Sequence, residues 1–464
     1  MIRKLALGVL AISSWLLGNS KDAECCGIIG MVSKQPVTEE EVKEAPTEKI
    51  TLEKFLCDGV ELLKNRGYDS AGIFRFGNGM EGKLIKYADE GDNTLSCIDR
   101  VIQEVLKESG VGTGGIAHTR WATCGARVSQ NAHPHFDQTG RFYAVHNGII
   151  TNHGDIKAHH LKGVKLTSET DTEIMVQFIA KEVLGGSSMH NALKAFGRIA
   201  GDKSQWGLVI VDREQPDKIY TYTNGSPLLI GFSKTEDQIY VVSERIAFQT
   251  FADYYLPTND DEIFELSAND IPQLKEKYKL RLIKMEAPPP VLKEPPAPFK
   301  TFFSYEVRQQ SNIPFEPEFD RIKDTLKFGD YLTMVACGSS FYAGQVSEPL
   351  FKALKCFKKF HVVDPAELDK HDITENETVV VISQSGETKD LIRIVDELKP
   401  MKNINTIGII NVEGSTLARK VDFPIYIKVG REICVAATKS FFHQVLNLIQ
   451  FATEVAEQKN NAPL

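Results

Sequence analysis

The hydrophobic pattern in the first part of the chain predicts a mixture of helices and strands. Apolar residues follow helical spacing from Leu52 through Phe55, Leu56 and Val60 to Leu63, so a helix is expected there. Elsewhere, short β-branched or aromatic runs are broken by Gly, Asn or Asp, which is typical of strands. These runs occupy residues 114–123, 141–150, 206–212, 218–223 and 238–243.

Farther along the chain, hydrophobic strands end in small polar residues and are followed by helical sequence. TMVACGSS at residues 333–340, TVVVISQSGET at 378–388 and TIGIINVEGS at 406–415 share this arrangement. A helix from about Val435 to Glu457 closes the chain. Hydrophobic strands that alternate with helices predict a parallel, doubly wound sheet.

A proline-rich run lies between these two patterns. Six prolines fall within PPPVLKEPPAP at residues 288–298, a composition that favours extended backbone and cannot lie inside a helix or a central strand. We therefore expect a linker at residues 287–300 between a domain of residues 26–286 and a second domain of residues 301–464. The sequence has no internal repeat of fixed period, which argues against a solenoid or a propeller.

The composition narrows the class of protein further. The chain has 464 residues, of which 42% are hydrophobic and 25% charged, as in ordinary globular proteins. Its net charge of −8 and the lack of a long Lys/Arg block argue against nucleic-acid binding. Eight cysteines are too few for a disulfide scaffold in a chain of this length.

The first 25 residues are expected to form a hydrophobic leader or propeptide. Arg3 and Lys4 precede an apolar run from Leu5 to Leu17, and a small-x-small sequence follows at residues 18–20. This resembles a signal peptide, and the run is too short for a stable membrane span. The alternatives are an unprocessed hydrophobic helix and an upstream segment that does not belong to the working protein.

Small polar residues occur where two strands of the second domain end. Hydroxyls and backbone N–H groups at such a turn, next to a helix N-terminus, favour the binding of an anion. Because open α/β sheets bind ligands at the carboxyl ends of their strands, a phosphorylated small molecule is the expected ligand. Helix capping alone would explain one such turn, but two turns with closely matching chemistry favour a site. The candidate residues are Ser339, Ser340, Ser383, Gln384, Ser385 and Thr388.

In the first domain, chemistry-bearing residues gather in six short strings. The pair His133 and His135 shares a strand face but has no further ligands at sensible spacing, so a metal site is not expected. The strings are CGIIG at residues 26–30, RGYDSAG at 66–72, HTRWAT at 118–123, NAHPH at 131–135, HNGII at 146–150 and SETDTE at 168–173. Together they resemble the N-terminal-nucleophile glutamine amidotransferase domain, and more narrowly the glutamine–fructose-6-phosphate aminotransferase family.

The second domain agrees with that resemblance. ACGSS at residues 336–340, SQSGET at 383–388 and VAATK at 435–439 are similar to the first of the two sugar-isomerase (SIS) domains of that family. The resemblance implies an α/β protein, with an N-terminal-nucleophile αββα sandwich followed by a doubly wound parallel-sheet SIS domain.

The resemblance assigns roles to residues of the first domain. Cys26 would be the nucleophile, with Asn147 and Gly148 forming the oxyanion hole. Arg120 would pair with the α-carboxylate of glutamine and Asp171 with its α-ammonium group. Trp121 resembles a residue that gates the passage of ammonia. Thr123 and His133 complete the expected glutamine-binding set, whereas Cys124 replaces the histidine that is usual in the family.

The family's nucleophile uses its own free α-amino group as the base, which fits the ordinary pKa of such an amine, about 7.7–8.0. Cys26 has that amine only if the chain begins with it, so we expect processing between Cys25 and Cys26. N-terminal sequencing decides this, because a mature chain that starts at another residue argues against glutaminase activity.

The resemblance also assigns the sugar-phosphate site. Ser339, Ser340, Ser383, Gln384, Ser385 and Thr388 would bind fructose 6-phosphate, and Val435 would add a further contact. Ala437 stands where the family commonly has serine, so one hydroxyl contact is lost. The family's second SIS domain, with its proton-transfer carboxylate and ring-opening histidine, has no counterpart before Leu464. Lys439 matches a position other than the Schiff-base lysine.

The expected function is amino transfer from glutamine to fructose 6-phosphate, giving glucosamine 6-phosphate and glutamate. A stand-alone glutaminase half and a non-catalytic sugar-phosphate-binding regulator are the alternatives. The resemblance implies no metal or organic cofactor. It implies a homo-oligomer or a partner that supplies a second SIS domain. Because the substrates are cytosolic metabolites, a cytoplasmic location is expected despite the signal-like start.

Overall fold

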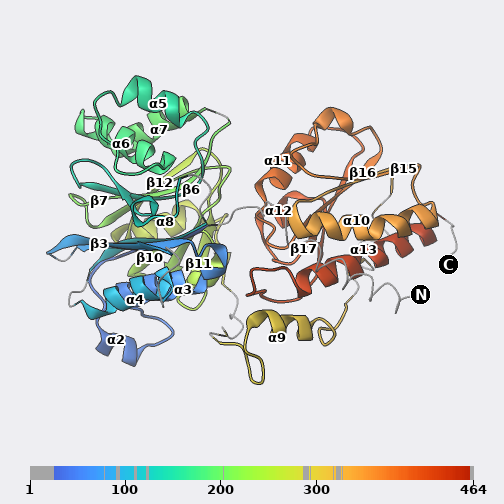
Figure 1. Cartoon of the computed structure of the whole chain (residues 1–464), viewed down its shortest axis with the longest axis horizontal. Coiled ribbons are helices and arrows are strands. Elements are labelled where there is room, and N and C mark those ends of the chain that lie inside the picture. Colours follow the sequence, from blue (N-terminus) through green and yellow to red (C-terminus); the bar gives the residue numbers. More distant parts are fainter. Residues whose placement is uncertain are drawn as a thin grey trace. The chain divides into compact units, whose positions relative to one another are not determined.

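The chain was analysed as a computed structural model, in which it divides into two compact units between residues 290 and 291 (Figure 1). Each unit is described by itself. The expected leader, Thr123, Cys124 and part of the expected linker lie outside the described residues. The structure describes residues 26–77, 79–89, 95–108, 112–121, 125–201, 203–285, 292, 294–316, 318–319, 326 and 328–459.

The first unit contains two antiparallel sheets. The larger has the order β13-β11-β9-β10-β1-β4-β2-β3 and the smaller the order β12-β8-β7-β6-β5. The strands are β1 (Gly27–Ser33), β2 (Ser70–Gly77), β3 (Met80–Ala88), β4 (Gly114–Arg120), β5 (His135–Phe136), β6 (Phe142–Ile149), β7 (Gln205–Asp212), β8 (Lys218–Asn224), β9 (Leu229–Ser233), β10 (Gln238–Val242), β11 (Ala252–Pro257), β12 (Glu262–Ser267) and β13 (Ile283–Lys284).

Helices cover the outer faces of both sheets, with α3 and α4 on one side and α5, α6 and α7 on the other (Figure 1). Helix α3 confirms the helix that was predicted from the apolar spacing beginning at Leu52. The side chain of Thr51 caps its first turn by accepting a hydrogen bond from the backbone N–H of Lys54. The helices are α2 (Glu39–Glu44), α3 (Leu52–Leu62), α4 (Cys97–Lys107), α5 (His153–His160), α6 (Asp171–Leu184), α7 (Met189–Ala200) and α8 (Ile271–Lys277).

Alternating side chains explain why the two sheets stack. In β1, Ile28 and Val32 lie in the core shared by the two sheets, whereas Ile29 and Met31 pack with the α3–α4 layer. In β6, Val145 likewise faces the other sheet, while the neighbouring residues of the strand pack against the helices on the outer face. Since strand residues point to opposite faces in turn, strands buried on both faces produce a four-layer αββα sandwich.

The second unit contains a five-stranded parallel sheet of order β15-β14-β16-β17-β18. Numbered along the chain, this is the 2-1-3-4-5 order of flavodoxin-like, doubly wound folds. Its elements are α9 (Phe302–Gln309), β14 (Tyr331–Val335), α10 (Gly338–Leu354), β15 (Lys359–Val363), β16 (Glu377–Ser383), α11 (Lys389–Leu398), β17 (Asn405–Ile410), α12 (Thr416–Lys420), β18 (Phe423–Tyr426) and α13 (Lys439–Gln458).

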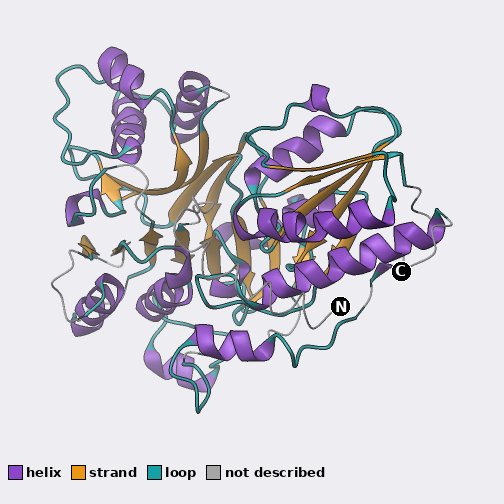
Figure 2. Cartoon of the chain, turned by 45° about the vertical axis from the view of Figure 1, so that its right-hand side comes forward, coloured by secondary structure: helices purple, strands orange, loops and turns teal. Residues whose placement is uncertain are grey.

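Helices pack on both faces of this sheet (Figure 2). Val380 and Ile382 of β16 contact the core shared with α10 and α13, whereas Val379 and Val381 contact the core shared with α11 and α12. The structure thus confirms the expected α/β fold class for both parts of the chain. Among the described residues, no helix is both long and apolar enough to cross a membrane.

One expected boundary is wrong. The final helix was expected from about Val435, but α13 begins at Lys439. Two carboxylates, the buried Glu306 and the partly buried Glu432, bind backbone N–H groups between residues 433 and 440. These bonds hold the segment before Lys439 as an irregular loop, a long-range effect that local helical periodicity does not contain.

Candidate active site

Cys26 lies directly before β1 and is partly exposed. Its Sγ accepts a hydrogen bond from the backbone N–H of Trp121, with a nitrogen-to-sulfur distance of 3.3 Å. Burial raises the pKa of the Cys57 thiol to about 12 and that of Cys97 to about 11, so neither forms a thiolate near neutral pH. Cys26 is therefore better placed than these two to act as a nucleophile.

Asn147 connects Cys26 to the opposite sheet. Its Nδ2 donates to the backbone carbonyl of Cys26 at 2.8 Å, and its Oδ1 lies 2.9 Å from Nε2 of His118. Burial lowers the pKa of His118 to about 3, so the imidazole is neutral at pH 7. Because Asn147 offers its oxygen to His118, Nε2 of His118 carries the proton and donates it. His118 thereby fixes which end of the Asn147 amide faces Cys26.

His118 is the first residue of the HTRWAT motif, but the sequence motifs assign it no role. Ile116 of β4 faces the other sheet, and His118 is two residues farther along the same strand. Cys26 follows the same rule relative to Ile28, as does Asn147 relative to Val145. In each case, a polar residue lies two positions from a hydrophobic residue that faces the other sheet, so both point to the same side. This alternation is the sequence signal that could have identified the site.

Gly148 occupies a position that only glycine tolerates. Its φ is +135°, and a Cβ there would lie 2.1 Å from the carbonyl oxygen of Gln205. Gly148 is exposed and follows Asn147 near the end of β6. A second residue of the expected oxyanion hole therefore has an accessible backbone beside the Asn147 amide.

His133 belongs to a cluster of buried histidines behind Asn147. Its ring stacks on His118 with centroids 4.2 Å apart and meets His135 edge-on at 4.7 Å. Burial lowers the pKa of His133 and of His135 well below the usual value, so these rings pack as neutral groups. His133 accepts the backbone N–H of His146 at 3.4 Å. The cluster supports the surface on which Asn147 lies.

The described residues contain no group of three or more His, Cys, Asp or Glu side chains that could hold a metal ion.

Arg120 and Asp171 lie at element ends that border Cys26 and Asn147. Arg120 ends β4, is only 4% exposed and precedes Trp121, whose ring meets that of Tyr68 edge-on at 5.0 Å. Asp171 is the first residue of α6, and its Oδ2 accepts the N–H of Ile150 at 2.8 Å. This bond ties the SETDTE string to the HNGII string.

Hydrogen bonds between Glu169, Ala126 and Asn131 form a clasp near the same region. Oε2 of Glu169 accepts the N–H of Ala126 at 3.0 Å and the side-chain Nδ2 of Asn131 at 3.1 Å. The N–H of Glu169 donates to Oδ1 of Asn131 at 3.0 Å. These bonds lower the pKa of Glu169, the bond from Ala126 having the largest effect, and keep the carboxylate charged. The clasp brings NAHPH and SETDTE together.

Lys86 holds the backbone of the NAHPH segment through hydrogen bonds. Its Nζ donates to the backbone carbonyls of Gln130, Ala132 and Pro134 at 3.2, 2.7 and 3.3 Å. Burial lowers the pKa of Lys86 to about 8. Sequence reasoning did not find Lys86, because an isolated lysine on β3 carries no motif.

The low pKa of Lys86 predicts a specific pH dependence of stability. The folded state releases the proton near pH 8, whereas the unfolded chain keeps it to about pH 10.5. The unfolded state therefore binds more protons in this window, so stability rises with pH. We expect the free energy of unfolding of the wild type, relative to Lys86→Met, to increase from about pH 8 to about pH 10.5, as measured by urea denaturation. A difference that stays flat with pH would contradict the assignment.

In the second unit, two polar turns meet where the strand order reverses. Ser339 and Ser340 lie in the first turn of α10 after β14, and Ser383 ends the neighbouring β16. The gap between β14 and β16 is the switch point of this sheet, where doubly wound folds bind ligands. The structure thus brings both serine-containing turns to one place.

The turn after β16 is ordered by its own hydroxyls. Oγ of Ser383 accepts the N–H of Gly386 at 2.9 Å and lies 2.8 Å from Oγ1 of Thr388. Gln384 and Ser385 complete this turn, and Oγ of Ser385 accepts the N–H of Glu387 at 3.1 Å. Thr388 is the residue before α11. Val435 lies apart from these turns in sequence, on the loop before α13, and is 53% exposed.

Comparison with known proteins gives the family. Residues 118–250 match the glutamine amidotransferase domain and residues 330–454 the SIS domain. A protein of Acanthamoeba polyphaga mimivirus named "Probable glutamine--fructose-6-phosphate aminotransferase [isomerizing]" is 33% identical over 87% of this chain and 67% of its own length. The chain belongs to the glutamine–fructose-6-phosphate aminotransferase family.

Other members of the glutamine–fructose-6-phosphate aminotransferase family match at similar levels. The aminotransferase of Streptococcus pneumoniae is 31% identical over 94% of this chain and 70% of its own length. A solved C-terminal domain of glucosamine-fructose-6-phosphate aminotransferase from Francisella tularensis is 26% identical, with a TM-score of 0.32, over 36% of this chain and 50% of that chain. Family membership confirms the resemblance of the sequence motifs and makes this chain an enzyme.

Proposed function

We propose that the protein transfers the amide nitrogen of glutamine to fructose 6-phosphate, forming glucosamine 6-phosphate and glutamate. The first unit would hydrolyse glutamine and the second would bind the sugar phosphate. The observation that carries the proposal is the placement of Asn147, which bonds to Cys26 through Nδ2 and to His118 through Oδ1. The names of the relatives support the same reaction.

In the first unit, the thiolate of Cys26 attacks the side-chain carbonyl of glutamine. The resulting oxyanion is stabilised by the amide of Asn147 and the N–H of Gly148. The free α-amino group of Cys26, which has taken the thiol proton, returns it to the leaving nitrogen, so the collapse releases ammonia and leaves a thioester on Cys26. Water then hydrolyses the thioester to glutamate and restores the thiol. Arg120, Trp121, Thr123, His133 and Asp171 form the proposed glutamine-binding set, in which Arg120 and Asp171 recognise the two charges of the amino acid.

In the second unit, the serine-containing turns bind the phosphate and hydroxyls of fructose 6-phosphate. The hydroxyls of Ser339, Ser340 and Ser385 and the backbone N–H groups near the start of α10 supply donors for an anion. Ser383, Gln384 and Thr388 form the opposite side, and Val435 adds a contact from the loop before α13. Cleavage of the amide and binding of the sugar phosphate are thus assigned to different units.

Purified protein supplied with glutamine alone should release glutamate. Addition of fructose 6-phosphate should give glucosamine 6-phosphate when a chain that carries a second SIS domain is also supplied. Glutamate without the amino sugar would favour a stand-alone glutaminase half. Fructose 6-phosphate binding without glutamate release would favour a regulatory protein. The family relationship favours the aminotransferase over both alternatives.

Two further expectations accompany this function. Self-association, or association with a chain that carries another SIS domain, is tested by sedimentation of the purified protein. A cytoplasmic location follows from the cytosolic substrates and is tested by cell fractionation.

Ser383→Ala should weaken the binding of fructose 6-phosphate by about 10-fold or more, measured by calorimetry. It removes the acceptor of the Gly386 N–H and the partner of Thr388, so the turn loses its internal order. Ser311→Ala is a matched control, since its exposed hydroxyl bonds to the backbone carbonyl of Arg308 in α9 and to the side chain of Asn312. Equal affinities of wild type and Ser383→Ala would place the site elsewhere.

A further inference from the structure

Helix α9 inserts one charged residue into the second unit. All eight of its residues are described, and Glu306 is the buried one, with an exposure of 1%. Phe303 and Val307 of the same helix are exposed. An amphipathic helix normally buries its apolar residues, so a helix that buries a carboxylate instead indicates a specific polar partner.

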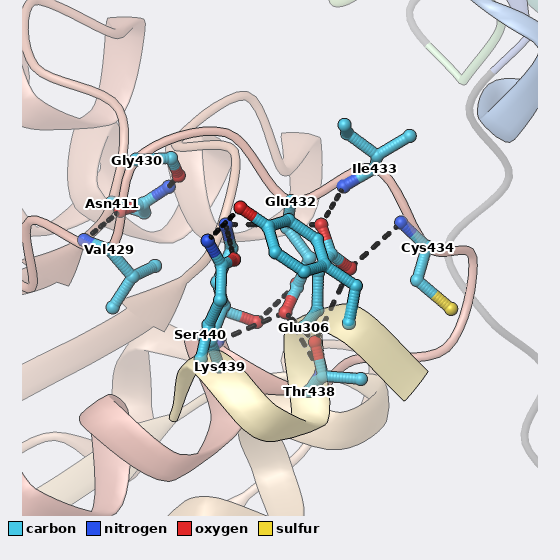
Figure 3. Close-up of polar contacts among 12 residues, drawn as sticks. Glu306, Asn411, Val429, Gly430, Glu432, Ile433, Cys434, Thr438, Lys439 and Ser440 are labelled. Carbon is cyan, nitrogen blue, oxygen red and sulfur yellow. Dashed lines mark hydrogen bonds and ion pairs between the residues drawn. The ribbon is translucent and has the colours of Figure 1, made fainter. Parts of the chain in front are cut away.

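That partner is the loop before α13. Oε1 of Glu306 accepts the backbone N–H of Ile433 at 2.6 Å, and Oε2 accepts the N–H of Cys434 at 3.0 Å (Figure 3). Oγ1 of Thr438 lies 3.5 Å from the same Oε2. A carboxylate that accepts two adjacent backbone N–H groups fixes the orientation of both peptide units.

A second carboxylate holds the other end of this loop. Glu432 accepts the N–H of Thr438 at 2.8 Å and the N–H of Ser440 at 3.0 Å. Lys439 places its Nζ 3.9 Å from Glu306 (Figure 3). The same Nζ donates to Oε1 of Gln309 at 3.2 Å. The buried charge of Glu306 is therefore balanced by a nearby cation and by backbone dipoles.

The loop presents Val435 directly after the two peptide units that Glu306 holds. Val435 is 53% exposed although its neighbours are anchored by buried groups. Residues 431–438 form no helix or strand, so these long-range bonds set the backbone geometry at Val435. Moving Ile433 and Cys434 would move Val435 with them.

We propose that Glu306 is a positioning residue of the sugar-phosphate site. Its carboxylate holds the peptide N–H groups of Ile433 and Cys434 and so fixes the backbone that presents Val435 to fructose 6-phosphate. This inference rests on the proposed function of the second unit. Glu306 acts through the loop and has no direct part in the chemistry.

The test compares Glu306→Gln with wild type in the full chain. Gln retains one acceptor oxygen and replaces the other with an NH₂ group, which opposes the N–H it faces. Loss of one hydrogen bond to a charged group predicts affinity for fructose 6-phosphate about 10- to 100-fold weaker by calorimetry. Amide hydrogen exchange at Ile433 and Cys434 should quicken by a similar factor.

Glu316→Gln is the matched control. Glu316 is an exposed carboxylate whose Oε2 lies 3.4 Å from Nζ of Lys428. Lys428 precedes the loop of residues 431–438 in the chain. Glu316→Gln should leave both the affinity and the exchange unchanged. Glu306→Asp, which keeps the charge on a shorter side chain, should fall between wild type and Glu306→Gln.

The outcomes separate this inference from the function on which it rests. A wild type that does not bind fructose 6-phosphate overturns the proposed function of the second unit. A wild type that binds, together with a folded Glu306→Gln of equal affinity, overturns the positioning role. Faster exchange with unchanged affinity also overturns it, because Glu306 would then stabilise the loop without serving the site.

Discussion

Asn147→Ala should lower kcat for glutamine hydrolysis by about 100- to 1,000-fold and leave KM for glutamine nearly unchanged. The Asn147 amide is the side-chain donor of the proposed oxyanion hole, and a group that stabilises charge only in the transition state affects kcat rather than substrate binding. The substitution also removes the bonds to the Cys26 carbonyl and to His118. Steady-state measurement of glutamate release provides both constants.

Asn152→Ala is the matched control for this result. Asn152 lies five residues farther along the chain, and its Nδ2 donates to the carbonyl of Ile199 at 2.7 Å, away from Cys26. Its loss removes the same kind of side chain without touching Cys26 or Gly148, so kcat should stay near the wild-type value. If Asn147→Ala raised KM and spared kcat, Asn147 would serve glutamine binding instead.

Arg75→Met should lower the free energy of unfolding of the first unit by about 3–5 kcal/mol. Arg75 is a β2 residue with a side-chain exposure of 2%, and it bridges Glu53 at 3.2 Å and Glu108 at 2.7 Å. Removing the cation takes the Arg75 ion pair from the partly buried Glu53 and leaves Glu108 paired with the exposed Lys83. The expected loss is large because the free-energy cost of removing a carboxylate from water remains when the ion pair that offset it is lost.

Lys83→Met is the control, because Lys83 pairs with the same Glu108 but has a side-chain exposure of 54%. Its loss should cost about 0–1 kcal/mol. Urea denaturation followed by tryptophan fluorescence measures both variants. Trp15, Trp121 and Trp206 are the chain's three tryptophans, so no signal comes from residues 291–464. Equal losses for the two variants would mean that burial does not decide the contribution of these ion pairs.

Much of the architecture could be predicted from local patterns. Helical spacing identified α3, and β-branched runs identified β4, β6, β7, β8 and β10. Strands that end in small polar residues predicted the parallel sheet and placed Ser339 and Ser383 at its carboxyl edge. These features depend on residues close in sequence, where periodicity and turn chemistry carry the information.

The parts of the site that escaped prediction depend on contacts between distant residues. His118 meets Asn147 from another sheet, and Glu306 reaches a loop more than 120 residues away. The hydrogen bonds of Lys86 go to three backbone carbonyls, which leave no side-chain pattern in the sequence that could point to it. The early start expected for α13 has the same origin, since local periodicity does not register a carboxylate from another helix.

The placement of Cys26 and Asn147 on opposite sheets has a consequence for how the protein tolerates mutation. The span that the Asn147 amide bridges is set by the volumes of side chains such as Ile28, Val145 and Val209, which separate the two sheets. Interiors packed at crystal-like density transmit small changes in volume. A conservative core substitution that hardly alters the melting temperature can therefore shift Asn147, the proposed oxyanion donor, relative to Cys26. The thickness of the hydrophobic layer between the two sheets therefore sets the distance between Cys26 and Asn147.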